Sequence, residues 1–246
     1  HGPGRLLAVC WRQWRAERAL ARRGVRFRST DVRVVAAAYA AMSDDEFEAI
    51  NGRQAWANWR AIPRALSGNV PDRPLRVLDL GCGDGELMYL LAKEKDAKVQ
   101  GIEIDDDAIY KCVARGLSVF HGDIDSGLKE YPDNSFDYVI LNQAMQQARK
   151  ADFVIQEGLR VGKKLIIGFP NFAFINARAS LFFKGKTPVT PSLPYRWYNT
   201  PNLHFLTISD FRSYCADRKI KILASRYLSG NRIVRVWPNL FAMDAI

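Results

Sequence analysis

The sequence predicts an α/β protein whose core is a doubly wound, mostly parallel β-sheet. Three observations lead to this prediction. Between residues 76 and 170, short apolar runs alternate with helical segments, and this alternation is typical of parallel strands joined by right-handed crossovers. The first apolar run ends in a glycine-rich turn at residues 81–85. A Gly-Asn pair between two later apolar runs is a hairpin signal, so we expect the sheet to end antiparallel.

The N-terminal part of the chain is set apart by its composition. Residues 1–33 contain nine arginines and two acidic residues, so most of the net charge of +10 lies there. Such an arm, with Trp11 and Trp14, could contact RNA, an anionic membrane or an acidic partner. It could equally be a solvated helix, a leader or a tag remnant. We favour these structural explanations, and nucleic acid is not the expected partner.

A helix is predicted next, and a boundary follows it. The segment Ser-Asp-Asp-Glu at 43–46 has the spacing of a capping box, and apolar residues recur at helical intervals to about Leu66. Turn signals at 68–69 and 71–74 then precede the first strand. We therefore expect a helical extension with an Arg-rich arm at 1–70 and one α/β domain at 71–246, a length that can bury a single large core.

The first half of this domain reads as strands and helices in turn. Strands are predicted at 77–80, 99–103, 117–120, 135–141 and 164–169. A helix follows the glycine turn, a second begins at the acidic residues 105–107 and ends at Gly116, and a third covers 152–159. Parallel strands in this arrangement bind ligands at their carboxyl ends.

The second half is less regular. Residues 170–207 are rich in Pro, Asn and aromatic residues, and we expect a long irregular insertion of the kind that forms binding loops or lids. Ser209 is expected to cap a helix that ends near Arg218. Two apolar runs, 220–228 and 232–237, flank the hairpin signal at 229–231.

The glycine turn and the following strand predict the ligand. Gly81, Gly83 and Gly85 permit positive φ and let backbone N–H groups approach an anion at a helix N-terminus. A dinucleotide site would place its third glycine where this chain has Glu86, so the loop favours S-adenosylmethionine over NAD. Glu103, at the end of the second strand, can then accept hydrogen bonds from the ribose hydroxyls. The alternative is an ordinary tight turn with an unrelated acidic strand end.

The cysteines and the hydropathy exclude several classes of protein. The four cysteines lack metal-ligand spacing, so we expect free thiols in a reducing compartment and no metal site. We interpret Cys82 as a small residue suited to the turn and not as a nucleophile. No apolar stretch approaches the roughly 20 residues that span a bilayer, and no signal-peptide core is present. These features favour a cytoplasmic protein.

From about Arg76 to Leu228 the chain resembles the MetW family of methionine biosynthesis proteins, a branch of the class I S-adenosylmethionine-dependent methyltransferases. Two matching strings, Val-Leu-Asp-Leu-Gly-Cys-Gly-Asp-Gly-Glu-Leu and Gly-Ile-Glu-Ile-Asp, are shared by methyltransferases at large. Matches more specific to the family occur at 169–172 and at 193–195 with 197–198 and 200–202. Further matches lie at 112–116, 122–125 and 136–141. Residues 1 to about 65 lie outside the family pattern, and Asn199 stands where an Asp is expected.

The resemblance implies a seven-stranded sheet that ends in an antiparallel hairpin, and a set of cofactor-binding residues. Asp79, Gly81 and Gly83 would shape the methionine end of the site, Glu103 would hold the ribose, Asp123 with Ile124 would contact the adenine, and Asn142 would lie beside the reactive methyl group. With their neighbours, the expected set is Asp79, Gly81, Cys82, Gly83, Gly85, Glu103, Ile104, Asp123, Ile124 and Asn142. The implied partner is a homoserine O-acyltransferase, and the resemblance supplies no methyl acceptor.

Three functional hypotheses follow. In the first, the protein is a methyltransferase that releases S-adenosylhomocysteine and has an unidentified small-molecule or protein acceptor. In the second, it is a non-catalytic cofactor-sensing partner of the acyltransferase. In the third, it is a nucleic-acid methyltransferase that uses the basic arm. Methyl transfer needs mainly positioning, and the candidate bases are His204, Tyr195 and Tyr198, although a lone histidine is more often structural. The aromatic residues of Phe-Pro-Asn-Phe at 169–172 are expected to wall the pocket.

Overall fold

The computed structural model describes residues 61–63, 66, 73–230 and 232–246. The Arg-rich arm, the capping box at 43–46 and the expected boundary near residue 70 lie outside the described residues. Residues 61–63 are helical, and Ile62 and Leu66 are fully buried against Leu87 and Leu91. The end of the predicted helix therefore packs on the α/β domain, as expected.

Within the described residues, eight strands form one sheet in the order β3-β2-β1-β4-β5-β8-β6-β7. The strands β1 to β5 pair parallel with one another, which confirms the predicted parallel sheet. The strands are β1 (Arg76–Leu80), β2 (Lys98–Glu103), β3 (Ser118–His121), β4 (Tyr138–Asn142), β5 (Leu165–Pro170), β6 (Tyr227–Ser229), β7 (Arg232–Ile233) and β8 (Asp244–Ala245). The order reverses between β1 and β4, and ligands of open α/β sheets bind at such a point.

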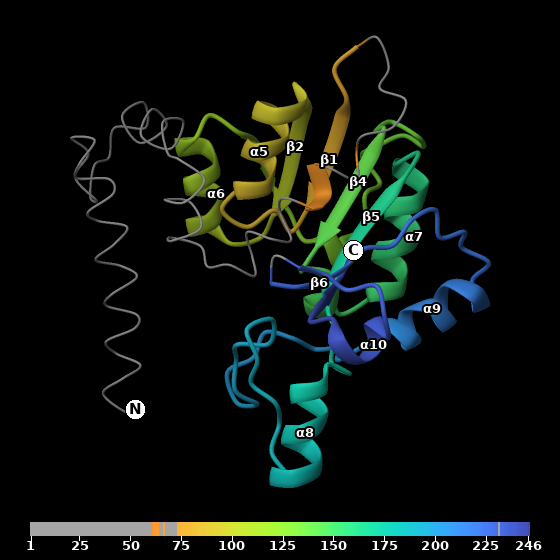
Figure 1. Ribbon diagram of the computed structural model, residues 1–246. Helices are drawn as coiled ribbons and strands as arrows, with labels where there is room; N and C mark the ends of the chain where they lie inside the picture. The colour runs from red at the N-terminus through yellow and green to blue at the C-terminus, as the bar shows by residue number, and fades with distance from the viewer. Residues whose placement is uncertain (1–60, 64–65, 67–72, 231) are drawn as a thin grey trace.

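Helices cover both faces of the sheet (Figure 1). Alternate residues of a strand point to opposite faces, and the two faces accordingly have separate cores. Leu78 and Leu80 belong to the core under α7 (Ala151–Val161) and α9 (Ile208–Asp217). Val77 belongs to the core under α5 (Glu86–Lys95). The helix α6 (Asp106–Ala114) adds Cys112 to a small cluster with Cys82 and Met88 on the α5 side.

The C-terminal part of the sheet differs from the prediction. The antiparallel hairpin forms at β6 and β7, but residues 220–226 and 234–237 are not strands. An unexpected strand, β8, lies between β5 and β6 and pairs antiparallel with both. The strand β8 contributes only Asp244 and Ala245 to these ladders, and the next residue, Ile246, exchanges backbone hydrogen bonds with Arg226. The short helix α10 (Pro238–Phe241) connects β7 to β8.

The expected irregular insertion at 170–207 contains a helix, α8 (Ile175–Lys184), which projects away from the sheet (Figure 1). Ala177 is its one fully buried residue, although apolar residues recur at helical intervals at Ile175, Ala179, Phe182 and Phe183. The next helix, α9, is capped by Thr207 and not by Ser209: Thr207 accepts from the N–H of Asp210, whose carboxylate accepts from the N–H of Thr207. None of the helices in the described stretches is long and apolar enough to cross a membrane.

The Phe-Pro-Asn-Phe segment is a structural junction. Asn171 is 1% exposed, and its amide donates to the carbonyls of Asn239 (3.1 Å) and Ala242 (2.8 Å). Its side-chain oxygen accepts from the N–H groups of Ala173 (3.1 Å) and Ile208 (3.4 Å). One side chain therefore joins β5, α10 and the start of α9.

Replacing this side chain is expected to destabilise the fold. Because Asn171→Ala leaves buried carbonyl and N–H groups without partners, the free energy of unfolding should fall by about 2–3 kcal/mol. Equilibrium urea unfolding measures this change. The control is Asn176→Ala, at an exposed position of α8, which should leave the free energy nearly unchanged. Equal effects of the two substitutions would contradict the structural role of Asn171.

Candidate functional site

A cleft of about 640 Å³ lies at the carboxyl ends of β1, β2, β3 and β4. Nine of the ten residues that the sequence predicted for the cofactor site line it. They are Asp79, Gly81, Cys82, Gly83, Glu103, Ile104, Asp123, Ile124 and Asn142. The cleft therefore brings together side chains from four separate strand ends, as expected for a doubly wound sheet.

The glycine turn forms the floor of the cleft. Gly81 and Gly83 have φ of 68° and 54°, in the left-handed region that favours glycine. The N–H groups of Gly81 and Cys82 donate to the carbonyl of Ile102, at 2.9 and 3.2 Å. A Cβ at Gly81 would lie 2.7 Å from the Cβ of Ala144, so only glycine lets the turn approach the segment after β4.

Gly85, the tenth residue of the predicted set, does not line the cleft. It is the N-cap of α5, with φ of 79°. A Cβ there would lie 2.6 Å from Leu117 and 2.9 Å from the sulfur of Cys112. The third glycine is therefore needed for close packing of α5 against α6 and the start of β3.

Glu103 faces the glycine turn from the end of β2. One carboxylate oxygen, Oε2, accepts from the N–H of Gly83 at 2.7 Å, and Oε1 accepts from the N–H groups of Ile104 (2.9 Å) and Asp105 (3.1 Å). An ionised carboxylate offers about four acceptor positions. The backbone therefore orients Glu103 and leaves capacity for a further donor in the cleft.

Asp79 is the buried acid of the site. It lies at the end of β1 and is 2% exposed. Burial, and next the negative charge of Glu103, raise the pKa of its carboxyl from 3.8 to about 7. Near neutral pH this group can gain or lose a proton, and a nearby cation would hold it ionised.

The far end of the cleft combines an exposed apolar side chain with a rigid turn. Ile104 is 60% exposed although it lines the cleft. Opposite lies a single 3₁₀ turn (Ile124–Ser126), where the Asp123 side chain accepts from the N–H of Asp125 at 2.9 Å. The carboxylate of Asp125 accepts from the N–H groups of Arg149 (2.8 Å) and Lys150 (2.7 Å). This region can hold a flat apolar group between Ile104 and the turn.

Asn142 carries an unsatisfied buried atom into the cleft. It ends β4, and its Oδ1 is buried without a hydrogen-bond partner in the described part of the chain. A Cβ at Gly168 would lie 2.1 Å from this oxygen, so the neighbouring strand must have glycine there. Buried polar atoms are normally satisfied, so this oxygen, which packs beside Gly168, is an exception among the described residues.

The cleft is strongly acidic. Its lining includes seven carboxylate residues and one arginine, Arg149. The acids are Asp79, Asp84, Glu86, Glu103, Asp105, Asp123 and Asp125. Glu86 is paired with Arg115, and burial raises the pKa of its carboxyl to about 7 despite that arginine. This electrostatic environment favours a ligand with positive charge and disfavours a polyanion.

Cys82 does not have the properties of a nucleophile. It is buried, and a hydrogen bond with Cys112, followed by burial, raises the pKa of the Cys82 thiol far above its usual range. The thiol is therefore protonated at neutral pH, and reactivity needs the thiolate. No group of three or more potential metal ligands occurs among the described residues.

The three candidate bases do not line the cleft. His204 contacts the carbonyl of Ala148 through Nε2 at 2.9 Å, and Ala148 does line the cleft. Tyr195 and Tyr198 are 46% and 59% exposed, on the segment between α8 and α9. The structure thus gives His204 a structural contact at the rim.

The expectation for the aromatic residues at 169–172 is also wrong. Phe169 is buried against Phe211, with ring centroids 5.0 Å apart, and Phe172 packs on Phe205 at 5.1 Å. Neither lines the cleft at the glycine turn. That wall is made by residues the prediction missed, Gln143, Ala144, Gln147 and Arg149. Their position directly after β4, at the reversal of strand order, was the available signal.

Comparisons with known proteins agree on family and fold. A family model described as "Methionine biosynthesis protein MetW" matches residues 66–246. The bifunctional methionine biosynthesis protein MetXA/MetW of Rhodopirellula baltica is 32% identical over 179 residues, which cover 66% of this chain and 29% of that protein. The chain spans less than half the length of the curated relatives it matches.

Solved methyltransferase structures share the fold. One, from Thermotoga maritima, is an S-adenosylmethionine-dependent methyltransferase described as a possible histamine N-methyltransferase. The alignment has a TM-score of 0.53 at 17% identity, and it covers 80% of this chain and 93% of that chain. Another, an S-adenosylmethionine-dependent methyltransferase from Mesorhizobium loti, has a TM-score of 0.53 at 19% identity, with coverage of 73% and 88%. Similarity at this level of identity establishes the doubly wound architecture.

Proposed function

Since the chain belongs to the MetW family of methionine biosynthesis proteins, we propose that its cleft binds S-adenosylmethionine. The observation that carries this proposal is the acidic cleft, in which seven carboxylate residues face one arginine. S-Adenosylmethionine has a sulfonium, an ammonium and one carboxylate, so its net charge is positive. A dinucleotide brings a doubly charged pyrophosphate, which this cleft would repel.

The lining residues fit the three parts of this ligand. Glu103, already oriented by three N–H groups, accepts from the ribose hydroxyls. Ile104 and the turn at Asp123 and Ile124 enclose the adenine. Asp79, at the end of β1, attracts the ammonium of the methionine end. The bound ligand would supply an activated methyl group.

We propose that the protein acts in methionine biosynthesis as a ligand-sensing partner of a homoserine O-acyltransferase. Support comes from the family match and from the relative named MetXA/MetW, in which a MetW part occurs in a bifunctional chain. Binding of S-adenosylmethionine, a product derived from methionine, would let such a partner respond to the output of the pathway.

Methyl transfer is the second candidate, and one observation favours it. Asn142, which ends β4 and lines the cleft, has a side-chain oxygen with no hydrogen-bond partner among the described residues. There it could accept a hydrogen bond from an acceptor amine or hydroxyl and orient it toward the methyl group, and such positioning is the main requirement of this displacement. Radiolabel transfer from S-adenosylmethionine to a protein or metabolite would distinguish this role from sensing.

A ligand series tests the proposed site. In calorimetric titrations, S-adenosylmethionine and S-adenosylhomocysteine should both bind, whereas NAD should give no measurable binding at the same concentrations. Methylthioadenosine, which lacks the amino-acid end, should bind at least about tenfold more weakly, because it has no ammonium for Asp79 to attract. Preferential binding of NAD would refute the proposal.

A further inference from the structure

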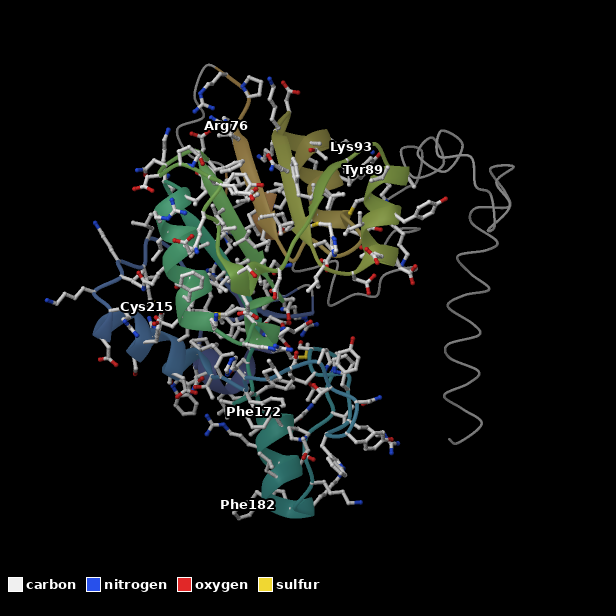
Figure 2. All side chains as sticks on the ribbon, turned by 180° about the vertical axis from the view of Figure 1, so that it is seen from behind. Arg76, Tyr89, Lys93, Phe172, Phe182 and Cys215 are labelled. Atoms are coloured by element: carbon white, nitrogen blue, oxygen red, sulfur yellow. The ribbon has the colours of Figure 1, made fainter. Side chains whose placement is uncertain are left out.

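The part of the chain that comprises α8 and the segment between α8 and α9 exposes an unusual set of aromatic side chains. We call residues 172–206 the aromatic lobe. Phe182 and Phe183, at the end of α8, are 82% and 80% exposed, and Trp197 is 75% exposed. Figure 2 places Phe172 at the base of the lobe and Phe182 at its far end, away from the sheet. Several large aromatic side chains exposed on one lobe are typical of a binding surface.

The lobe is held firmly at its base. The N–H groups of Leu203 and His204 donate to the carbonyl of Gln146, at 2.8 and 3.0 Å. Ser192 donates to the buried carboxylate of Asp244 at 2.8 Å, and Leu193 is 5% exposed. These contacts, with the junction at Asn171, order the lobe and present its aromatic residues without a large loss of conformational entropy on binding.

All the charges of the lobe are basic. Between Asn171 and Ser209 the sequence has no Asp or Glu. Its four cations, Arg178, Lys184, Lys186 and Arg196, are exposed, and none forms an ion pair with another described residue. The lobe therefore complements a partner surface that carries negative charge next to apolar hollows.

We propose that the aromatic lobe is a docking surface for an acidic patch on a folded partner protein. Exposed Phe, Trp, Tyr and Arg side chains are the residues that dominate protein interfaces. Four dispersed cations fall short of the dense basic cluster that recognises anionic lipid, and a nucleic acid would require many phosphate contacts. The aromatic residues supply the anchors, and the cations steer the encounter.

The base of the lobe connects this surface to the cleft. Gln146 belongs to the 3₁₀ turn Met145–Gln147, and Gln147 and Ala148 line the cleft. His204 contacts the carbonyl of Ala148. The lobe thus touches the same short segment as a ligand in the cleft, and any coupling between the two binding events would be reciprocal.

The experiment uses the homoserine O-acyltransferase of the same organism as the probe, and in this choice it rests on the proposed function. Binding of the full-length chain is measured by biolayer interferometry with S-adenosylmethionine present. The double variant Phe182→Ser/Trp197→Ser should weaken binding at least about tenfold, and so should Lys184→Glu/Lys186→Glu, more strongly at low salt. Tyr110→Ser and Lys98→Glu, exposed on α6 and β2, should bind as the unmodified chain does.

The outcomes separate the two proposals. All variants must retain ligand affinity in the cleft, which shows that they fold. If the unmodified chain and the lobe variants bind the acyltransferase equally well, the docking surface is refuted while the partnership stands. If the unmodified chain does not bind it, the partnership fails, and the lobe proposal fails with it. The lobe variants are also tested for binding to phosphatidylserine vesicles and to single-stranded RNA. If they lose either of these while they still bind the acyltransferase, the lobe proposal is overturned.

Discussion

Glu103→Ala is expected to weaken S-adenosylmethionine binding at least about 30-fold, or about 2 kcal/mol, because charge-assisted hydrogen bonds to the ribose are lost. The substitution also removes the acceptor that fixes the position of Gly83, whose N–H donates to this carboxylate at 2.7 Å. Calorimetry measures the affinity. Glu130→Ala, at an exposed position outside the cleft, is the matched control and should bind as the unmodified chain does.

A modified ligand separates ribose recognition from a general effect on the turn. With 2′-deoxy-S-adenosylhomocysteine, the unmodified chain should lose affinity relative to the natural ligand, whereas Glu103→Ala should lose little more. This double cycle isolates the contact between the carboxylate and the hydroxyl. An equal loss in both proteins would show that Glu103 does not hold the ribose.

Asp79→Asn is expected to stabilise the protein at alkaline pH. The pKa of Asp79 is about 7 in the fold, above the usual 3.8, so folding favours the protonated form. The stability of the unmodified chain therefore falls as pH rises from about 4 to 7, and the neutral amide avoids this loss. The free energy of unfolding at pH 8 should rise by about 2–4 kcal/mol, with little gain near pH 4. Urea unfolding at both pH values tests this.

The same substitution should impair binding. Because the ionised carboxylate attracts the ligand's ammonium, the affinity of the unmodified chain should decline as pH falls below about 7, the pKa of the buried acid. Asp79→Asn should bind at least about tenfold more weakly at pH 8 and should not show that decline. The stability prediction has its own contradicting outcome. If the free energy of unfolding of Asp79→Asn at pH 8 is no higher than that of the unmodified chain, the charge of Asp79 is not buried.

The end of the sheet that carries the cleft could be predicted because its sequence signals are local. The glycine turn, the helix cap at Asp105 and the acid at Glu103 each follow from a few adjacent residues, and parallel alternation then brings the strand ends together. Thr207 could also have been found: its third neighbour, Asp210, completes a capping box, whereas Ser209 has Arg212 at that position.

The remaining features depend on contacts between distant parts of the chain. The strand β8 has two residues, and it forms because β5 and β6 lie on either side of it. The helix α8, by contrast, has a local signal, because Ile175, Ala179, Phe182 and Phe183 recur at helical intervals. The contact of His204 with Ala148, 56 residues away, has no signal in the local sequence.

The most direct test is a crystal structure of the chain soaked with S-adenosylhomocysteine. The account predicts adenine between Ile104 and the turn at Asp123, the ribose hydroxyls on Glu103, and the amino-acid end at Asp79 and Gly81. A cleft that remains empty at saturating ligand, or a ligand bound elsewhere on the molecule, would contradict the central claim.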